Sequence, residues 1–148
     1  MTTSTVYHTA TLRIGGSAAG VPQVNLGSDA AGYFKLMWTN GYTFNNNHSA
    51  KAQITNEITQ SEYTAGGISL TNVTFTIEAS GTAKWDADDV AVSASGAALA
   101  ANGHVLYADA ITGDPLILFI NTEGTAEAGS STQYRVVWAA DGILQIKP

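Results

Sequence analysis

Cysteine is absent from the 148 residues of this chain. Disulfide bonds, thiolate metal sites and cysteine nucleophiles are therefore excluded. Charge is also scarce, because charged residues make up 12% of the chain, about half the usual share of roughly 25%. Hydrophobic residues still make up 45%, so the composition is that of a chain that buries a core rather than a disordered one.

The few basic residues do not cluster. Six Lys and Arg stand singly along the chain against twelve Asp and Glu, which gives a net charge of −6. Binding to a nucleic acid requires clustered cations that neutralise phosphates, so we expect no nucleic-acid partner. No apolar run approaches the roughly 20 residues of a membrane span, so we expect no membrane partner either. The start MTTSTVYHT lacks the basic and apolar regions of a signal peptide, and we expect no secretion.

Period-two alternation is the main structural signal. From Val6 to Ile14, apolar residues alternate with Tyr and polar residues, which predicts a strand. A glycine-rich turn follows over residues 15–20, and a second short strand is predicted over 21–26. The pattern favours an N-terminal arm, residues 1–28, that packs on or between subunits, followed by a main domain over residues 29–148.

The main domain contains further short strand candidates separated by turn residues. They cover 33–38, 68–77 with a β-bulge near Asn72, 82–85, 90–94, 104–108, 116–120, 134–138 and 143–146. The run 116–120 is apolar at every position, which predicts a strand that is central in its sheet or lies under a partner. Such spacing predicts an all-β, single-domain antiparallel β-sandwich or jelly-roll-like barrel.

Helical and turn signals are few. Ser49 could cap one short helix over Ala50–Ile58, so the prediction is at most one short helix. The segment 42–67 is otherwise irregular. Residues 139–142 end in Gly142 and predict a hairpin turn from which the strand 143–146 returns.

No constellation of residues predicts catalysis or a cofactor. Asp86, Asp88 and Asp89 form one acidic cluster that could hold Ca²⁺, but the EF-hand positions for Gly and Glu hold alanine, so a polar turn is the preferred interpretation. The three histidines, His8 and His48 and His104, lack metal-ligand spacing and are interpreted as surface or strand residues. We predict no catalytic, cofactor or metal site, although a paired-carboxylate hydrolase has no fixed spacing in sequence to test.

The aromatic residues divide into two groups. Trp38, Trp138 and Phe119 lie in strand-like alternation and are predicted to pack in the core. Tyr42, Phe44 and Tyr63 lie in the irregular segment and are predicted to make exposed contacts. A flat aromatic strip that binds carbohydrate is the alternative.

Several short motifs, taken in order, resemble a known family. They are TNEI at 55–58, YTAGGISL at 63–70, WDADDV at 85–90, VLY at 105–107, PLI at 115–117 and VWAADGIL at 137–144. Together they resemble a family of small structural proteins of tailed bacteriophages, over roughly residues 30–147. Residues 2–26 depart from the family's usual pattern, because an added strand and glycine-rich turn come first.

The resemblance implies a role in the virion without catalysis. It favours a capsid decoration (cement) protein, made in the bacterial cytoplasm and bound to the outside of the phage head. Its partners would be identical subunits, in a closed oligomer such as a trimer, and the major capsid protein. The residues expected to make these contacts are Val6, Leu12, Ile14, Tyr42 and Phe44. The alternatives are a tail or tail-fibre component that attaches to host-surface glycans and, less favoured, a surface-polysaccharide hydrolase.

Overall fold

The computed structural model describes residues 3–15, 22–129 and 131–147. The elements, in chain order, are β1 (Thr3–Val6), α1 (His8–Gly15), β2 (Phe34–Thr39), the 3₁₀ turn η1 (Lys51–Gln53), β3 (Ile68–Ser69), β4 (Thr74–Ile77), β5 (Ala83–Asp86), β6 (Val90–Ser93), β7 (Leu99–Ala108), β8 (Leu116–Ala128), β9 (Gln133–Val136) and β10 (Leu144–Ile146). The predicted fold class is confirmed: the chain is an antiparallel β-sandwich with one short α-helix.

The central layer is a five-stranded antiparallel sheet in the order β1-β8-β7-β2-β3. Strands β7 and β8 form its middle, and residues 116–120 are buried at every position, as the apolar run predicts. Apolar residues on both faces of these strands require a cover on each side. In the part of the chain that the structure describes, no sheet closes into a barrel.

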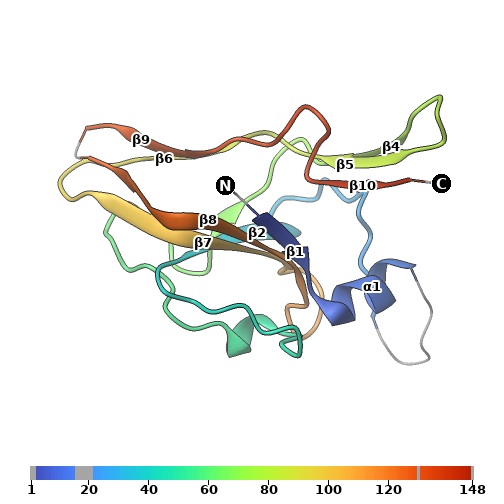
Figure 1. The fold of residues 1–148 in the computed structure, drawn as a ribbon, viewed down its shortest axis with the longest axis horizontal. Helices are drawn as coiled ribbons and strands as arrows, with labels where there is room; N and C mark the ends of the chain where they lie inside the picture. The colour runs from blue at the N-terminus through green and yellow to red at the C-terminus, as the bar shows by residue number, and fades with distance from the viewer. Residues whose placement is uncertain (1–2, 16–21, 130, 148) are drawn as a thin grey trace.

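Two smaller sheets cover one face of the central sheet, which we call the sandwich face. They have the orders β10-β5-β4 and β6-β9 and lie side by side in one layer (Figure 1). Contact between the layers is aromatic: the rings of Phe34 and Trp85 lie 4.9 Å apart, and those of Trp38 and Tyr134 lie 4.6 Å apart. Edge-on and tilted rings at such distances are favourable packing arrangements.

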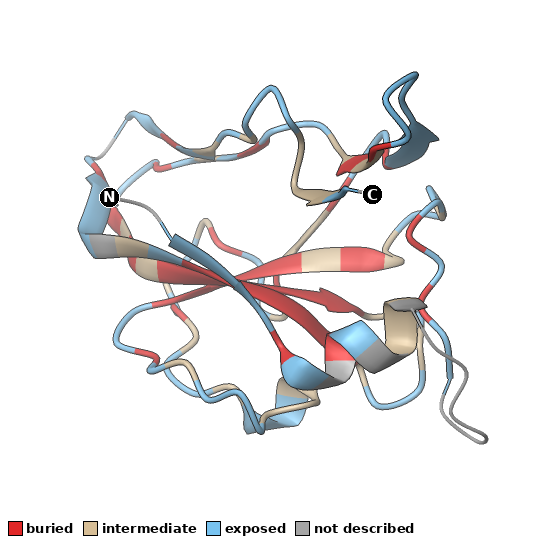
Figure 2. Cartoon of the chain, turned by 45° about the vertical axis from the view of Figure 1, so that its right-hand side comes forward, coloured by how far each residue is buried: buried red, intermediate tan, exposed pale blue. Residues whose placement is uncertain are grey.

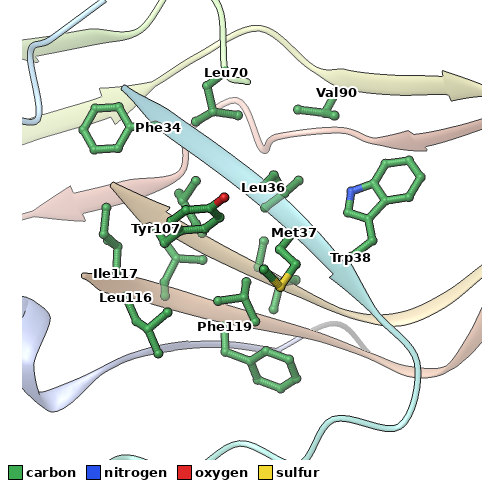
Figure 3. Close-up of a cluster of buried hydrophobic side chains, with 14 of the residues drawn as sticks. Phe34, Leu36, Met37, Trp38, Leu70, Val90, Tyr107, Leu116, Ile117 and Phe119 are labelled. Atoms are coloured by element: carbon green, nitrogen blue, oxygen red, sulfur yellow. The ribbon is translucent and has the colours of Figure 1, made fainter. Parts of the chain in front are cut away.

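The irregular segment after β2 covers the opposite face, which we call the loop face. Tyr42 and Phe44 reach the ring of Phe119 on β8, at 5.3 Å and 5.9 Å between ring centres. The central strands are thereby buried on both sides, as the red strands of Figure 2 and the packed side chains of Figure 3 show. A segment without regular structure therefore completes the core.

The N-terminal strand is shorter than the alternation predicts. Only Thr3–Val6 pairs, with β8, and the following residues form the helix α1. Tyr7, Ala10 and Ile14 follow the spacing of one helical face: Tyr7 and Ala10 are buried, and Ile14 is half-buried against the core. The prediction of one strand over 6–14 is therefore wrong. A strand would place Tyr7 on the face opposite to Ala10 and Ile14, whereas a helix places all three on the face that packs against the core.

Two further predictions of regular structure are wrong. Residues 22–26 form no strand, although Val24 and Leu26 are buried, and residues 16–21 lie outside the described part. The helix expected over 50–58 is a single 3₁₀ turn, Lys51–Gln53. The Gln53 side chain accepts the backbone N–H groups of Ser49 and Ala50, so this turn is fixed by its own side chain rather than by Ser49.

The predicted bulge at Asn72 is a change of sheet. Asn72 has a φ of 51°, and it separates β3 in the central sheet from β4 in the smaller one. The predicted turn at Gly142 is present, with a φ of 81°, but β10 pairs with β5 rather than with β9. Both errors have one cause, because local turn residues do not encode which sheet the next strand joins.

Gly67 gives a direct test of how the irregular segment meets β2. Its φ is +95°, and an added Cβ would lie 2.8 Å from the carbonyl carbon of Leu36. We expect Gly67→Ala to lower the free energy of unfolding by about 2–5 kcal/mol, because backbone strain and a backbone clash combine. Gly113→Ala is the matched control, since its φ is +84° and no atom lies within 4 Å of its added Cβ. Urea denaturation that finds equal losses for the two variants would contradict this packing.

Candidate binding site

A cavity of about 530 Å³ lies between the sandwich face and the segment that leads from β9 to β10. Ligand pockets typically have volumes of about 300–1,000 Å³. Ser4, Ile120 and Thr122 line it from the central sheet, and Val136, Trp138 and Ile143 line it from the covering layer. The strand β1 and the segment that follows β9 therefore meet in one site.

A histidine and a tyrosine pair at the cavity wall. His104 of β7 is 1% exposed, and its Nε2 lies 3.2 Å from the hydroxyl of Tyr134 on β9. The Tyr134 hydroxyl donates to the Ala101 carbonyl at 3.3 Å. Because that hydroxyl has one proton, we assign the imidazole proton to Nε2, which then donates to the tyrosine oxygen. Nδ1 of His104 is left as an acceptor, and no described residue forms a hydrogen bond with it.

Burial sets the charge of this pair. It lowers the pKa of His104 to about 4 and raises the pKa of Tyr134 to about 12. Both changes follow from removal of the charged form from water. The His104–Tyr134 pair is therefore neutral at pH 7, and the charged side chains that line the cavity are those of Glu127 and Arg135.

The acidic cluster fixes the rim of the cavity. Asp89 accepts the backbone N–H of Trp138 at 3.0 Å and lies 3.5 Å from the Arg135 guanidinium. The Trp138 indole N–H donates to the Asp88 carbonyl at 2.9 Å, which holds its half-buried ring in place.

The remaining carboxylates of the cluster are engaged as well. Asp88 accepts from Asn72 at 2.6 Å, and Asp86 pairs with Lys84 at 2.9 Å. These contacts are those of the predicted polar turn. Within residues 3–15, 22–129 and 131–147, no group of three or more His, Cys, Asp or Glu could hold a metal ion.

Side chains from the motifs quoted for the resemblance form hydrogen bonds that fix the backbone of neighbouring segments. Glu57 accepts from the Tyr63 hydroxyl at 2.8 Å and from the Gly66 backbone N–H at 2.5 Å. The Tyr63 oxygen accepts the Trp38 backbone N–H at 3.1 Å, and the Tyr107 hydroxyl donates to the Gly66 carbonyl. Burial raises the pKa of the Tyr63 hydroxyl well above its ordinary value. This network attaches the irregular segment to the edge of β2.

The residues predicted to make contacts with other chains fall in three environments. Val6 is 36% exposed on the edge strand β1, whereas Ile14 is half-buried against the core. The backbone of Leu12 lies in α1, and its side chain lies outside the described part. Of the predicted set, Val6 alone is thus described with an exposed side chain.

The exposure predicted for the loop aromatics is wrong for two of them. Tyr42 is 7% exposed and Tyr63 is 6% exposed, while Phe44 is half-buried between Tyr7 and Phe119. The apolar loop face needs a cover, and these rings supply it. Trp138, predicted to lie in the core, is instead half-buried at the rim.

Sequence reasoning missed the His104–Tyr134 pair. The available signal was that His104 alternates with Leu106 and Ala108, which places all three on one face of β7. That periodicity predicts a buried histidine, but it does not identify the partner on β9. The described part of the chain also contains no helix with the length and apolar character needed to cross a membrane.

Comparison with known proteins identifies no relative: no family model, no curated protein and no solved structure matches the chain.

The buried imidazole predicts a pH dependence of stability. The unfolded state takes up a proton on His104 below its ordinary pKa of 6.5, whereas the folded state does so only near pH 4. The contribution of this group to the free energy of unfolding is therefore unchanged above pH 6.5 and falls by about 3 kcal/mol between pH 7 and pH 4. We expect His104→Phe to lose this fall, measured by urea denaturation at several pH values.

The matched control is His8→Gln, because the His8 side chain is exposed. It should keep the pH dependence of the unchanged protein. A His104→Phe variant whose stability falls as steeply as that of the unchanged protein would show that His104 is not the group responsible.

Proposed function

We propose that this chain is a structural protein of a bacteriophage virion, and that it acts as a capsid decoration protein on the outside of the head. Its partners are identical copies and the major capsid protein, and its role involves no catalysis. The ordered motifs between residues 55 and 144 support this proposal through their resemblance to phage structural proteins.

One structural observation carries the proposal. The exposed large hydrophobic residues lie on edge strands or beside one: Val6 on β1, Phe75 and Ile77 on β4, Ile146 on β10, and Val137 after β9. Edge strands have free backbone groups, and natural proteins usually protect them with charge or proline. The apolar residues of this chain are placed where a sheet can continue into another chain.

The strongest such place is the sheet β10-β5-β4. Its register puts Phe75, Trp85 and Leu144 in one apolar row, and Ile77, Ala83 and Ile146 in the next. Trp85 is buried against the central sheet, whereas Ile77 is 75% exposed. The second row thus extends past the core, as an apolar surface for attachment would.

Labelling of particles tests the proposed location. Antibody against the purified chain, applied to virions of the phage that encodes it, should label the whole head surface. Mass spectrometry should find it in a fixed, high ratio to the major capsid protein. Labelling confined to the tail would contradict the decoration role and would favour the tail.

Occupancy of variants tests the attachment surface. We expect Ile77→Lys to reduce the amount of chain bound to undecorated heads by about tenfold or more, because the burial of an isoleucine side chain is lost. Thr74→Lys is the matched control, since Thr74 is exposed on the same strand but points to the opposite face. Equal occupancy of the two variants would contradict attachment through this apolar row.

A tail component that binds host glycans is the second candidate. The cavity favours it, because an indole ring and the polar side chains of Glu127, Gln133 and Arg135 line one space. Such a combination of an aromatic surface with planar polar groups suits sugars. Titration with oligosaccharides of the host surface that perturbs Trp138 fluorescence would favour this candidate.

A further inference from the structure

The outer edge of β1 lies beside the cavity, and among the described residues its backbone groups have no partner strand. The Tyr7 N–H donates to the Ile117 carbonyl at 3.0 Å, and hydrogen-bonded pairs alternate along antiparallel strands. Thr5 and Thr3 therefore bond to β8, whereas Ser4 and Val6 direct their N–H and C=O groups away from it. In the described part of the chain, no strand lies on that side of β1.

The same alternation holds at the far side of the sheet, which supports the assignment. Followed through β8 and β7, it places the backbone groups of Phe34 and Trp38 on the outer edge of β2. There the Phe34 carbonyl accepts from Leu70, the Trp38 carbonyl accepts from Ile58, and the Trp38 N–H donates to Tyr63. That edge is covered within the chain, and the β1 edge is not.

We propose that two copies of this chain associate through β1, antiparallel and edge to edge, around a two-fold axis at Thr5. In this register Ser4 of each copy lies opposite Val6 of the other. All four outward backbone groups of each strand then pair, and the central sheets join into one continuous sheet. The edge is self-complementary, as an isologous contact requires.

The apolar residues beside this edge also agree with a second copy as the occupant. Ser4 and Val6 lie on the same side of β1, the sandwich face, and Ser4 and Val137 line the cavity. A two-fold axis perpendicular to the sheet keeps both covering layers, and with them both cavities, on the same side of the joined sheet. Val137, which is 65% exposed, and Val6, which is 36% exposed, then lie at the junction.

Charge favours the same occupant. Each copy carries a net charge of −6, which opposes association in most orientations. β1 consists of Thr3, Ser4, Thr5 and Val6, so two copies approach there without charge against charge. The strand also lacks the lysine or proline that usually protects an edge.

The contact area predicts a weak dimer. A four-residue strand pair with two valines from each copy buries less than the about 800 Å² per partner of a typical stable interface. We therefore expect reversible association that depends on concentration. An isologous contact gives a dimer, whereas the sequence analysis favoured a trimer. The number of copies in the oligomer therefore discriminates between the two expectations.

Cysteine cross-linking tests the register. The chain has no cysteine, so Thr5→Cys introduces a single thiol. Directly opposed residues of a non-hydrogen-bonded pair have Cα atoms about 4.5 Å apart, within disulfide range. Mild oxidation of the full chain should give a covalent dimer of Thr5→Cys.

The matched control is Thr76→Cys, because Thr76 is exposed on the edge strand β4. This variant should cross-link at least tenfold more slowly. Equal rates would overturn the proposal.

Charge insertion tests the association itself. Thr5→Lys places two ammonium groups opposite each other, and we expect the dimer dissociation constant to rise at least about tenfold in sedimentation velocity. Thr76→Lys should leave it unchanged. Thr5 is exposed, so the variant should keep the circular dichroism of the unchanged protein. A Thr5→Lys variant that dimerises as tightly as the unchanged protein would overturn the proposal. An unchanged protein that forms a trimer, or that is a monomer at every concentration, would also overturn it. The monomer would indicate that the strand of another protein binds to this edge. Both experiments use the purified chain. Their outcome is therefore independent of whether antibody labels the phage head.

Discussion

Burial of β7 and β8 on both faces is the constraint on which the rest of this structure depends. The strands are apolar above and below the sheet, and Leu106, Leu118 and Phe119 are nearly inaccessible to water. An antiparallel sheet usually needs one cover, whereas this one needs two. The small sheets provide the first cover, and the irregular segment with Tyr42 and Phe44 provides the second. The hydrogen bonds of Glu57 and Tyr63 attach that segment to β2, so these two side chains stabilise the second cover.

The first cover encloses the candidate binding site. The segment that joins β9 to β10 connects the two small sheets, and the cavity lies between this segment and Ser4 and Ile120 of the central sheet. The sheet below ends at β1, whose outward backbone groups have no strand beside them in the described part. A protein that assembles in many copies benefits from both features, because strand addition supplies hydrogen bonds and apolar contact together. Weak individual contacts become strong when many act at once.

The sequence predicts much of this fold, and its failures have physical causes. The strand at 116–120 could be placed because its residues are apolar at every position, and the turn at Gly142 because glycine favours a positive φ. The stretch from Tyr7 to Ile14 satisfies a period of two and helical spacing alike, and only the burial of Tyr7 discriminates between them. The loop aromatics could not be placed, because their burial depends on a sheet face formed by distant strands. The cavity could not be predicted at all, since Ser4 and Ile143 come together only in the folded chain.

Amide hydrogen exchange along β1 tests the central claim most directly: that the sheet is covered on both faces within the chain and open at this one edge. The Thr5 amide bonds to β8 and should exchange slowly at every protein concentration. The Ser4 and Val6 amides point outward and should exchange fast in dilute solution, then slow down as the concentration rises and copies pair. Fast exchange at Ser4 and Val6 at every concentration would contradict pairing at this edge, and slow exchange even in dilute solution would contradict an open edge.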